Sequence, residues 1–504
     1  MADERTGRAE AEISALLPRP PEPRGPVRAL ALLPLLLFLA FCQTAPPAAE
    51  PRPVPPPPTE DRASDAFLDD IEHRTFQWFW DLADPVTALT PDRAPTPSFS
   101  SVAAVGFGLT AYTIGAERHW VRREQAAERA AKTLRFLARA PEGAAPRGMT
   151  RYHGFFYHFL DMRTGERFRQ VELSTIDTTL LLAGALACES YFDRPDPVET
   201  QIRSDADALY RQADWGWASP RPPGVSMGWT PEAGFHGWNW RGYDESMILY
   251  VLALGSPTHP ADPAAWSEWT STYRWGTFYG EEHLNFSPLF GHQYSHAWID
   301  FRGIRDDYMR SKGIDYFENS RRATRSQRAY AIANPGRWAG YGQNVWGLTA
   351  CDGPLDGTLW IGGRRREFHG YAARGASLLN VIDDGTIAPA AAAGSIPFAP
   401  EIAIPALREM RRRWGERVFN RYGFVDAFNP TLSEAGVKPQ QGRIDPQIGW
   451  FDTDQLGIDQ GPILLMIENH RSELIWKTVR RNPYIVAGLR RAGFQGGWLE
   501  SPAR

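Results

Sequence analysis

The chain has 504 residues, of which 43% are hydrophobic, so it can bury a core of considerable size. Its formal net charge of −4 provides no strong positive field, which argues against nucleic acid or an anionic membrane surface as a partner. The three cysteines form no CxxC motif, so neither a redox centre nor a thiolate metal site is indicated.

The first 63 residues are predicted to lie outside the folded domain. Residues 1–42 end in the short apolar run ALALLPLLLFLAFC, which follows Arg24 and Arg28 as in an export signal. This run is too short to span a bilayer, and LAFC resembles a bacterial lipobox that would acylate Cys42 and tether the protein to a membrane. Residues 43–63 form a Pro-rich linker, so we expect an exported domain over 64–504, in the periplasm or at the cell surface.

From residue 64 onward, nearly apolar helices alternate with amphipathic ones. A helix that is apolar all round is covered on every side, whereas an amphipathic helix is covered on one face. About twelve helices in such pairs predict an all-α fold, an (α/α)6 barrel with an inner and an outer ring. A generic bundle and an open α-solenoid are the alternatives, although no fixed repeat length supports the solenoid. Residues 147–173 and 357–376 predict small β-hairpin insertions, the first with its turn near Thr164–Gly165.

Acidic residues recur where the apolar helices begin. Each alone is typical of a helix cap or of a first-turn acid favoured by the helix dipole. In a barrel the helix starts lie at one end, so five such places predict that the carboxylates converge in a cleft. The acids concerned are Glu172, Asp177, Asp244, Glu245, Asp383, Asp384, Asp426 and Asp459.

The stretch 229–254 joins an aromatic loop to an apolar helix, with Asp244 and Glu245 at the junction. Cleavage of a glycosidic bond needs one protonated and one ionised carboxyl group. The surrounding indole and phenol rings favour desolvation, so we expect a raised pKa and a proton-donor role for Glu245, and a capping role for Asp244. Indole faces stack on sugar rings. The candidate platforms are Trp229, Trp238, Trp240, Trp298 and Trp346.

A second dense stretch, 288–309, contains His292, His296, Asp300 and Arg302. An HxxxH spacing can bind zinc when it lies on a helix, but the glutamate of the metalloprotease motif is absent. We interpret these side chains as ligands of sugar hydroxyls, with ordinary loop packing as the alternative. The Trp-Gly-rich loop 344–354 adds Asp352 as a further subsite candidate.

Many separated motifs, in order, resemble the bacterial glycoamylase-like proteins, a group that includes the endo-β-1,2-glucanases of glycoside hydrolase family 144. The resemblance covers roughly residues 65–499. It departs from the family pattern at DTT, residues 177–179, where DTA is expected, and in extra residues around 221–223. The motifs that carry it include FQWFWDLADPVTALTPDR, ELSTIDTTLLLAGAL, GWNWRGYDESMILYVLALGSPTHP, HQYSHAWIDFRGIRD, GIDYFENSRRATRSQRAYAIANP, WGLTACDGP, DDGTIAP, YGFVDAFNP and GIDQGPILLMIENHRS.

The resemblance implies an (α/α)6 barrel, export, and hydrolysis of β-1,2-glucan with inversion. It also implies an essential acid at Glu245, with Asp177 and a later aspartate lining the cleft, matched to Asp426 or alternatively to Asp459. We therefore predict an exported endo-β-1,2-glucanase in which Glu172 helps to bind the sugar. No metal or organic cofactor is implied, the partner is the glucan, and a monomer is expected. The alternatives are an exo-acting or transglycosylating enzyme on the same fold, or a non-catalytic glucan-binding protein.

Overall fold

The computed structural model describes residues 62–434 and 436–500. The predicted export signal, including Cys42, lies outside the described residues. No helix in the described ranges is both long and apolar enough to cross a bilayer.

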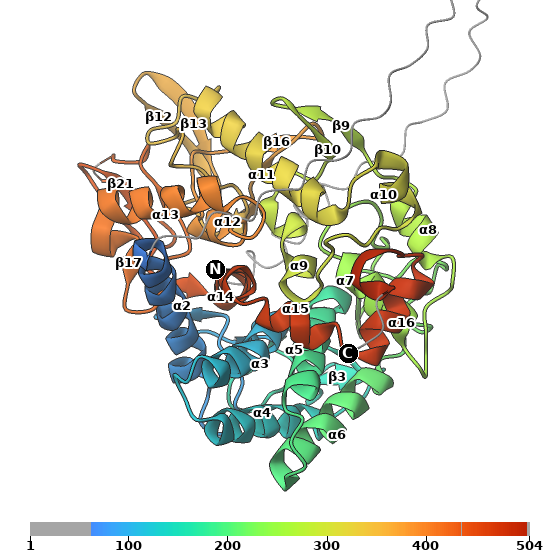
Figure 1. The fold of residues 1–504 in the computed structure, drawn as a ribbon. Coiled ribbons are helices and arrows are strands. Elements are labelled where there is room, and N and C mark those ends of the chain that lie inside the picture. The colour runs from blue at the N-terminus through green and yellow to red at the C-terminus, as the bar shows by residue number, and fades with distance from the viewer. Residues whose placement is uncertain (1–61, 435, 501–504) are drawn as a thin grey trace, which may run out of the picture.

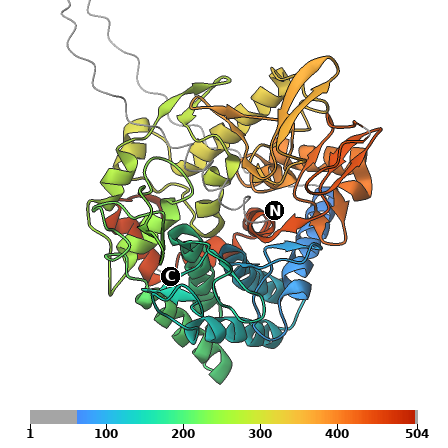
Figure 2. The same cartoon turned by 180° about the vertical axis from the view of Figure 1, so that it is seen from behind.

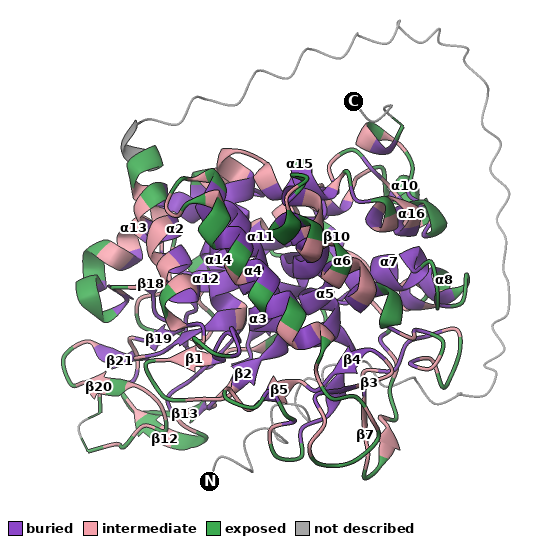
Figure 3. Cartoon of the chain, turned by 90° about the horizontal axis from the view of Figure 1, so that it is seen from below, coloured by how far each residue is buried: buried purple, intermediate pink, exposed green. Residues whose placement is uncertain are grey.

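An inner set of helices is buried on almost every side, because its sequences are apolar all round. Figures 1 and 2 show these helices in the middle of the molecule, and Figure 3 shows them mostly in the colour of buried residues. The inner helices are α3 (Val102–Glu117), α5 (Thr175–Tyr191), α7 (Met247–Gly255), α9 (Tyr294–Trp298), α12 (Pro389–Ala393) and α14 (Gly457–Arg471).

The outer helices bury one face each and surround the inner set (Figure 1). The helix-rich character of the chain and its alternation of buried with amphipathic helices are therefore confirmed. The outer helices are α2 (Arg62–Leu82), α4 (Arg123–Ala138), α6 (Pro197–Gln212), α11 (Tyr316–Ala333), α13 (Pro400–Trp414) and α16 (Pro483–Arg491). The shorter helices are α8 (Ala265–Thr270), α10 (Asp307–Lys312) and α15 (Leu474–Val479), with 3₁₀ turns η1 (Leu289–His292), η2 (Gly415–Arg417) and η3 (Gly497–Leu499).

Helices α3 and α5 meet at backbone contact. A Cβ atom added to Gly184 would lie 2.0 Å from the carbonyl oxygen of Gly106. One added to Gly106 would lie 2.2 Å from the carbonyl oxygen of Leu180. Only glycine fits at these two positions, so Gly106 of α3 and Gly184 of α5 let two inner helices come together.

The amphipathic run 472–492 forms two helices, α15 and α16, because Pro483 has no N–H for a continuous helix. The side chain of Asn482 caps the second part by accepting from the Tyr484 backbone N–H at 3.1 Å.

The strands are short, and all their pairs are antiparallel. The sheets are β1–β22, β2–β5, β3–β4, β6–β7–β8, β9–β10, β11–β14, β12–β13, β15–β16, β17–β18 and β19–β21–β20. Their bounds are β1 Arg93–Ala94, β2 Ser100–Ser101, β3 Arg151–Tyr152, β4 Phe155–Phe156, β5 Phe159–Leu160, β6 Leu173–Ser174, β7 Gly228–Thr230, β8 Gly234–Phe235, β9 Trp275–Phe278, β10 Glu281–Leu284, β11 Ala350–Cys351, β12 Gly357–Ile361, β13 Arg364–Phe368, β14 Ala372–Ala373, β15 Gly375–Ala376, β16 Val381–Ile382, β17 Phe419–Asn420, β18 Gly423–Phe424, β19 Phe428–Asn429, β20 Arg443–Asp445, β21 Gly449–Phe451 and β22 Gln455–Leu456.

The hairpin predicted over 147–173 is confirmed around its turn, where Leu160 and Arg167 form an antiparallel bridge, but not over its whole length. Two tight pieces replace the rest of it: β3 pairs with β4 around Gly154, and β5 pairs with β2 from a distant part of the chain. The predicted turn does occur, closed by a hydrogen bond from the Gly165 N–H to the Asp161 carbonyl at 2.8 Å. The hairpin expected within 357–376 forms as β12 and β13.

Many of the strands gather at one end of the inner helices (Figure 3). Strands β2, β6 and β22 lead directly into α3, α5 and α14, so these three helices start at that end. The fold thus brings separate helix starts to one place.

Candidate active site

Three acids mark the starts of inner helices. Asp177 lies in the first turn of α5, Asp459 in the first turn of α14, and Glu245 just before α7. All three affect Tyr294 at the start of α9: burial raises the pKa of this phenol most, and the charges of these acids raise it further. Carboxyl groups from the starts of three separate inner helices therefore act electrostatically on one hydroxyl group.

Asp244 and Glu245 are adjacent but differ in their surroundings. Asp244 Oδ1 accepts from the Ser246 backbone N–H at 2.9 Å and from Trp269 Nε1 at 3.3 Å, so this carboxylate holds the start of α7. Burial raises the pKa of Asp244 to about 6. Burial, followed by the charge of Asp244, raises the pKa of Glu245 well above its usual range. A protonated carboxyl at Glu245 is what a general acid requires.

Asp177 belongs to a short chain of polar side chains. Ser174 Oγ donates to Asp177 Oδ2 at 2.5 Å, and His158 Nε2 lies 3.6 Å from the same oxygen. The other ring nitrogen of His158, Nδ1, lies 2.7 Å from Glu172 Oε1. The predicted residues Glu172 and Asp177 are thus connected by a histidine that the sequence analysis missed. In the sequence His158 is distinguished only as a polar residue within an aromatic run. A hydrogen bond from the His158 backbone N–H to the Glu172 carbonyl places the imidazole between the two acids, and no local pattern indicates that bond.

Asp426 and Asp459 form a pair of buried acids. Each carboxyl group is close enough to the other to shift its pKa, and Asp426 Oδ2 accepts from the Asp352 backbone N–H at 2.7 Å. Asp426 Oδ1 and Asp459 Oδ2 are buried and have no donor among the described residues. Burial raises the pKa of Asp459 to about 7, and burial followed by the charge of Asp459 raises that of Asp426 well above its usual range. Two neighbouring carboxyl groups of this kind can share one proton, because the charge of one opposes ionisation of the other.

More acids surround this pair, which we call the Asp426–Asp459 pair. One oxygen each of Asp352, Asp426 and Asp452 lie within 4.8 Å of one another, an all-oxygen arrangement that could hold a hard cation. Arg93 already supplies positive charge there, with Nη1 2.5 Å from Asp352 Oδ2. Arg93 lies in strand β1 and Asp452 follows strand β21, and no local sequence pattern indicates that these short strands lie near the acids.

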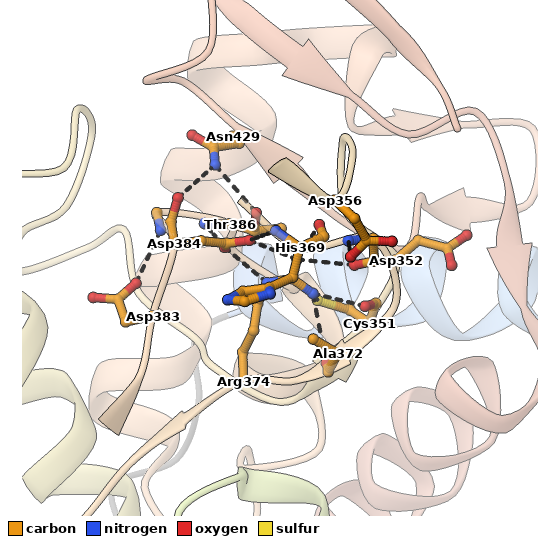
Figure 4. Close-up of polar contacts among 12 residues, drawn as sticks. Cys351, Asp352, Asp356, His369, Ala372, Arg374, Asp383, Asp384, Thr386 and Asn429 are labelled. Carbon is orange, nitrogen blue, oxygen red and sulfur yellow. Dashed lines mark hydrogen bonds and ion pairs between the residues drawn. The ribbon is translucent and has the colours of Figure 1, made fainter. Parts of the chain in front are cut away.

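The loop that carries Asp352 is fixed by a buried ion pair (Figure 4). Arg374 donates to both oxygens of Asp384 at 2.8 Å. Its guanidinium also donates to the carbonyl oxygens of Cys351 and His369, at 2.8 and 2.9 Å. Asp384 was expected among the cleft acids and is instead part of this scaffold.

The acid next to it has a similar role. Asp383 accepts hydrogen bonds from the Tyr330 and Tyr341 hydroxyls, each at 2.7 Å. Both oxygens of this carboxylate therefore accept hydrogen bonds from residues of the scaffold.

Three of the predicted stacking platforms are core residues, and for these the prediction is wrong. Trp298 and Trp346 are fully buried, and Trp298 Nε1 donates to Thr110 Oγ1 at 3.0 Å. Trp240 is buried and donates to Thr175 Oγ1 at 2.9 Å. All three side chains belong to the buried hydrophobic clusters of the protein.

Trp229 lies in strand β7, and Trp238 lies in the loop between β8 and α7. Trp229 is half-buried against Tyr152, with ring centroids 5.1 Å apart. Trp238 is 52% exposed. Both stay candidates for stacking on a sugar.

The predicted sugar ligands in 288–309 are also wrong, because this stretch forms η1 and the inner helix α9. His292 and His296 are fully buried, and burial lowers the pKa of each to about 3. His296 Nε2 lies 3.2 Å from Ser320 Oγ. Both rings therefore serve as neutral core residues.

Asp300 and Arg302 follow the C-terminal end of α9, at the opposite end of the molecule from the acids described above. Arg302 Nε and Nη2 donate to the two oxygens of Asp300 at 2.8 and 2.7 Å. Arg480 contacts the same carboxylate. This is a structural ion-pair cluster.

Comparison with known proteins identifies the relatives of the chain. A family model described as putative glucoamylase (Glycoamylase) matches residues 237–483. The structure of a putative glucoamylase from Bacteroides uniformis superposes with a TM-score of 0.73 at 32% identity, covering 88% of this chain and 100% of that one. An endo-β-1,2-glucanase from Chitinophaga pinensis has a TM-score of 0.71 at 28% identity, covering 86% of this chain and 99% of that one.

A curated relative is the exo β-1,2-glucooligosaccharide sophorohydrolase (non-reducing end) of Parabacteroides distasonis, 29% identical over 464 residues. The match covers 84% of this chain and 57% of the relative, so the chain spans little more than half of that protein. The predicted resemblance is confirmed, and the chain belongs to the glycoamylase-like family.

Proposed function

We propose that the protein is a glycoside hydrolase that cleaves a β-1,2-glucan, and that its two sets of helices form an (α/α)6 barrel. The observation that carries the proposal is that Asp177, Glu245 and Asp459 lie at the starts of three separate inner helices and that their charges all act on Tyr294. The substrate class rests on the relatives from Chitinophaga pinensis and Parabacteroides distasonis, which are named as β-1,2-glucan hydrolases.

In the proposed mechanism the protonated Glu245 donates to the glycosidic oxygen as the bond from that oxygen to the anomeric carbon breaks. The Asp426–Asp459 pair accepts a proton from the water whose oxygen bonds to the anomeric carbon. Direct attack by this water inverts the anomeric configuration. Either aspartate could take the proton, because the two share one site, so the pair is the base rather than one named member.

The group around Asp177 binds the sugar next to the scissile bond. His158 lies between Glu172 and Asp177 and holds their carboxylates in fixed positions. Ionised carboxylates accept from sugar hydroxyls, and charge-assisted hydrogen bonds of this kind are the stronger ones. Trp229 and Trp238 provide aromatic faces in strand β7 and in the loop between β8 and α7.

The mode of attack has two candidates. We favour endo cleavage, as in the Chitinophaga pinensis relative. The second is release of sophorose from the non-reducing end, as the Parabacteroides distasonis relative is named for. The purified protein is incubated with β-1,2-glucan polymer, and the products are separated by chromatography. A ladder of oligosaccharides is expected for endo cleavage, sophorose alone for the exo enzyme, and lengthened chains for transglycosylation.

Linkage is tested with the same protein and glucans of β-1,2, β-1,3, β-1,4 and β-1,6 linkage. Cleavage of β-1,2-glucan alone is expected. Binding without cleavage of any of these glucans would show a non-catalytic binding protein instead.

We also infer export, acylation at Cys42 and a monomeric state. The basis is the apolar run before Cys42 and the Pro-rich linker after it. Mass spectrometry of the N-terminus of the protein isolated from its native membrane tests acylation, and light scattering of the purified protein tests the monomer.

A further inference from the structure

We propose that the β12–β13 hairpin carries a second glucan-binding site, centred on Trp360, that holds the polysaccharide outside the catalytic cleft. The inference rests on the proposed function, because it concerns the same substrate. It adds a non-catalytic platform that neither the family model nor the relatives' names assign.

Trp360 is unusually exposed for so large an apolar side chain, at 72%. Its indole makes no ring contact and no cation–π contact among the described residues. Figure 3 shows β12 and β13 at the strand-rich end, largely in the colour of exposed residues. A single exposed apolar residue is common on protein surfaces, so exposure alone does not make a site.

The hairpin is anchored through its other face. Leu359 and Ile361 pack against the small core around Trp450. The Arg366 guanidinium lies 4.0 Å from the centroid of the Trp338 ring and donates to the Gly336 carbonyl at 2.6 Å. The indole of Trp360 is therefore presented by a fixed support, and little conformational entropy is lost when a ligand binds.

Polar side chains accompany the indole on the outward face. Trp360 is paired with Arg365 across the hairpin, and Thr358 with Glu367. Alternate residues of a strand point to the same side, and directly opposed residues share a face, so these four lie together. All four are exposed. An aromatic face with a hydroxyl, a guanidinium and a carboxylate matches a sugar, which has an apolar ring face and hydroxyl edges.

The hairpin is continuous with the acid site. It is inserted between Asp352 and Tyr371, and its base is closed by a bond from the Gly370 N–H to Asp356 Oδ1 at 3.0 Å. The pKa of Tyr371 is raised by burial and then by the charges of Asp459 and Asp426. At about 3.3 Å per strand residue, Trp360 stands roughly 10 Å beyond the hairpin base. A long glucan leaving the acids can reach it, whereas an oligosaccharide that fills only the cleft cannot.

The experiment compares long and short substrates. In the purified Trp360→Ala variant, KM for β-1,2-glucan polymer is expected to rise about three- to tenfold, the range for loss of one aromatic stack. The kcat on polymer and both constants on a short β-1,2-linked oligosaccharide are expected to stay at wild-type values. Trp360→Phe should restore most of the polymer affinity. Leu378→Ala, at an exposed residue on another loop, is the matched control and should leave KM and kcat unchanged on both substrates.

Affinity electrophoresis in gels that contain the polymer provides an independent reading, with faster migration expected for Trp360→Ala. Unchanged KM and migration would overturn the platform while leaving the proposed function in place. An equal rise in KM on both substrates would also overturn it, since Trp360 would then belong to the cleft. If the wild type cleaves neither substrate, the proposed function and the platform fail together.

Discussion

The two ends of the inner helices both carry buried acids, but in different electrostatic settings. At the strand-rich end, Asp426 and Asp459 each keep a buried oxygen without a donor. At the opposite end, Asp300 is saturated by two arginines. Glu468 likewise lies 2.7 Å from Arg118 Nε. An acid that is matched by arginine contributes to the scaffold, whereas acids packed against one another keep protons and can transfer them.

Glu72 shows that the two ends differ in the pairing of their acids with arginine and not in burial. It is buried beside Glu468, and burial raises its pKa well above the usual range, as at the other end. Arg471 Nη1, however, lies 2.5 Å from Glu72 Oε2, and Arg118 Nε lies 3.9 Å from Oε1. A raised pKa therefore does not identify a site by itself. The better criterion is whether an arginine pairs directly with the acid, as at Glu72, or with a neighbouring acid, as Arg93 does with Asp352 beside the Asp426–Asp459 pair.

The largest effect is expected at Glu245. Glu245→Gln should lower kcat on β-1,2-glucan by about 10²- to 10⁴-fold, because the amide cannot donate the proton. The melting temperature should be unchanged or higher, since the amide stays neutral at every pH and the buried carboxyl group does not. Glu128→Gln, at an exposed glutamate of α4, is the control and should keep wild-type kcat. Full turnover by Glu245→Gln would remove this residue from the proposed mechanism.

The second prediction concerns the Asp426–Asp459 pair. Asp426→Asn and Asp459→Asn should each reduce kcat by about 10²-fold or more, because each breaks the shared proton site. The kcat of the double variant should be no lower than that of the less active single variant, since the effects of residues that act as one unit are not additive. Steady-state kinetics of the three variants test this. Multiplicative losses would mean two independent roles.

At the opposite end the effect should fall on stability. Asp300→Asn removes the carboxylate that pairs with Arg302 and Arg480, and it should lower the free energy of unfolding by about 2–3 kcal/mol. This loss is smaller than for a fully buried ion pair, because both arginines are partly exposed. Urea unfolding measures this change. The kcat of the folded variant should stay within about twofold of wild type. A large loss of kcat would place Asp300 in the functional machinery and remove the contrast between the ends.

The fourth prediction uses pH. A carboxyl group with a raised pKa binds its proton more tightly in the folded protein than in the unfolded chain, so its contribution to stability falls as pH rises. For Asp459 this window runs from the ordinary value of 3.8 to about 7. The wild-type free energy of unfolding should therefore decrease more steeply between about pH 4 and 7 than that of Asp459→Asn. Equal slopes, measured by urea unfolding at several pH values, would contradict a retained proton.

The smallest effect is expected at His158, which positions acids and does not exchange protons with the substrate. His158→Ala should raise KM several-fold more than it lowers kcat, because Glu172 and Asp177 lose their bridge. His158→Gln, whose amide can replace one of the two contacts, should be intermediate. A fall in kcat as large as that of Glu245→Gln would instead give His158 a direct chemical role.

The helices could be predicted from the sequence because apolar and amphipathic periods are local. The starts of these helices could be predicted for the same reason, and the acids at those starts include Asp177, Glu245 and Asp459. His158, Arg93 and Asp452 could not be found this way, since they reach the site through pairing of two- and three-residue strands that have no periodicity. Trp298 and His296 were misjudged because α9 is short and polar in composition, so its burial follows from its neighbours.

The glycine contact between α3 and α5 bears on how this cleft could be redesigned. Helix α5 carries Asp177, and α3 separates it from α14, which carries Asp459. The closeness of α3 and α5 therefore depends on two residues without side chains, Gly106 and Gly184. A single methyl group at Gly184 would move α5 outward. We expect variation in substrate width among relatives to track residue size at these core positions as well as substitutions in the loops.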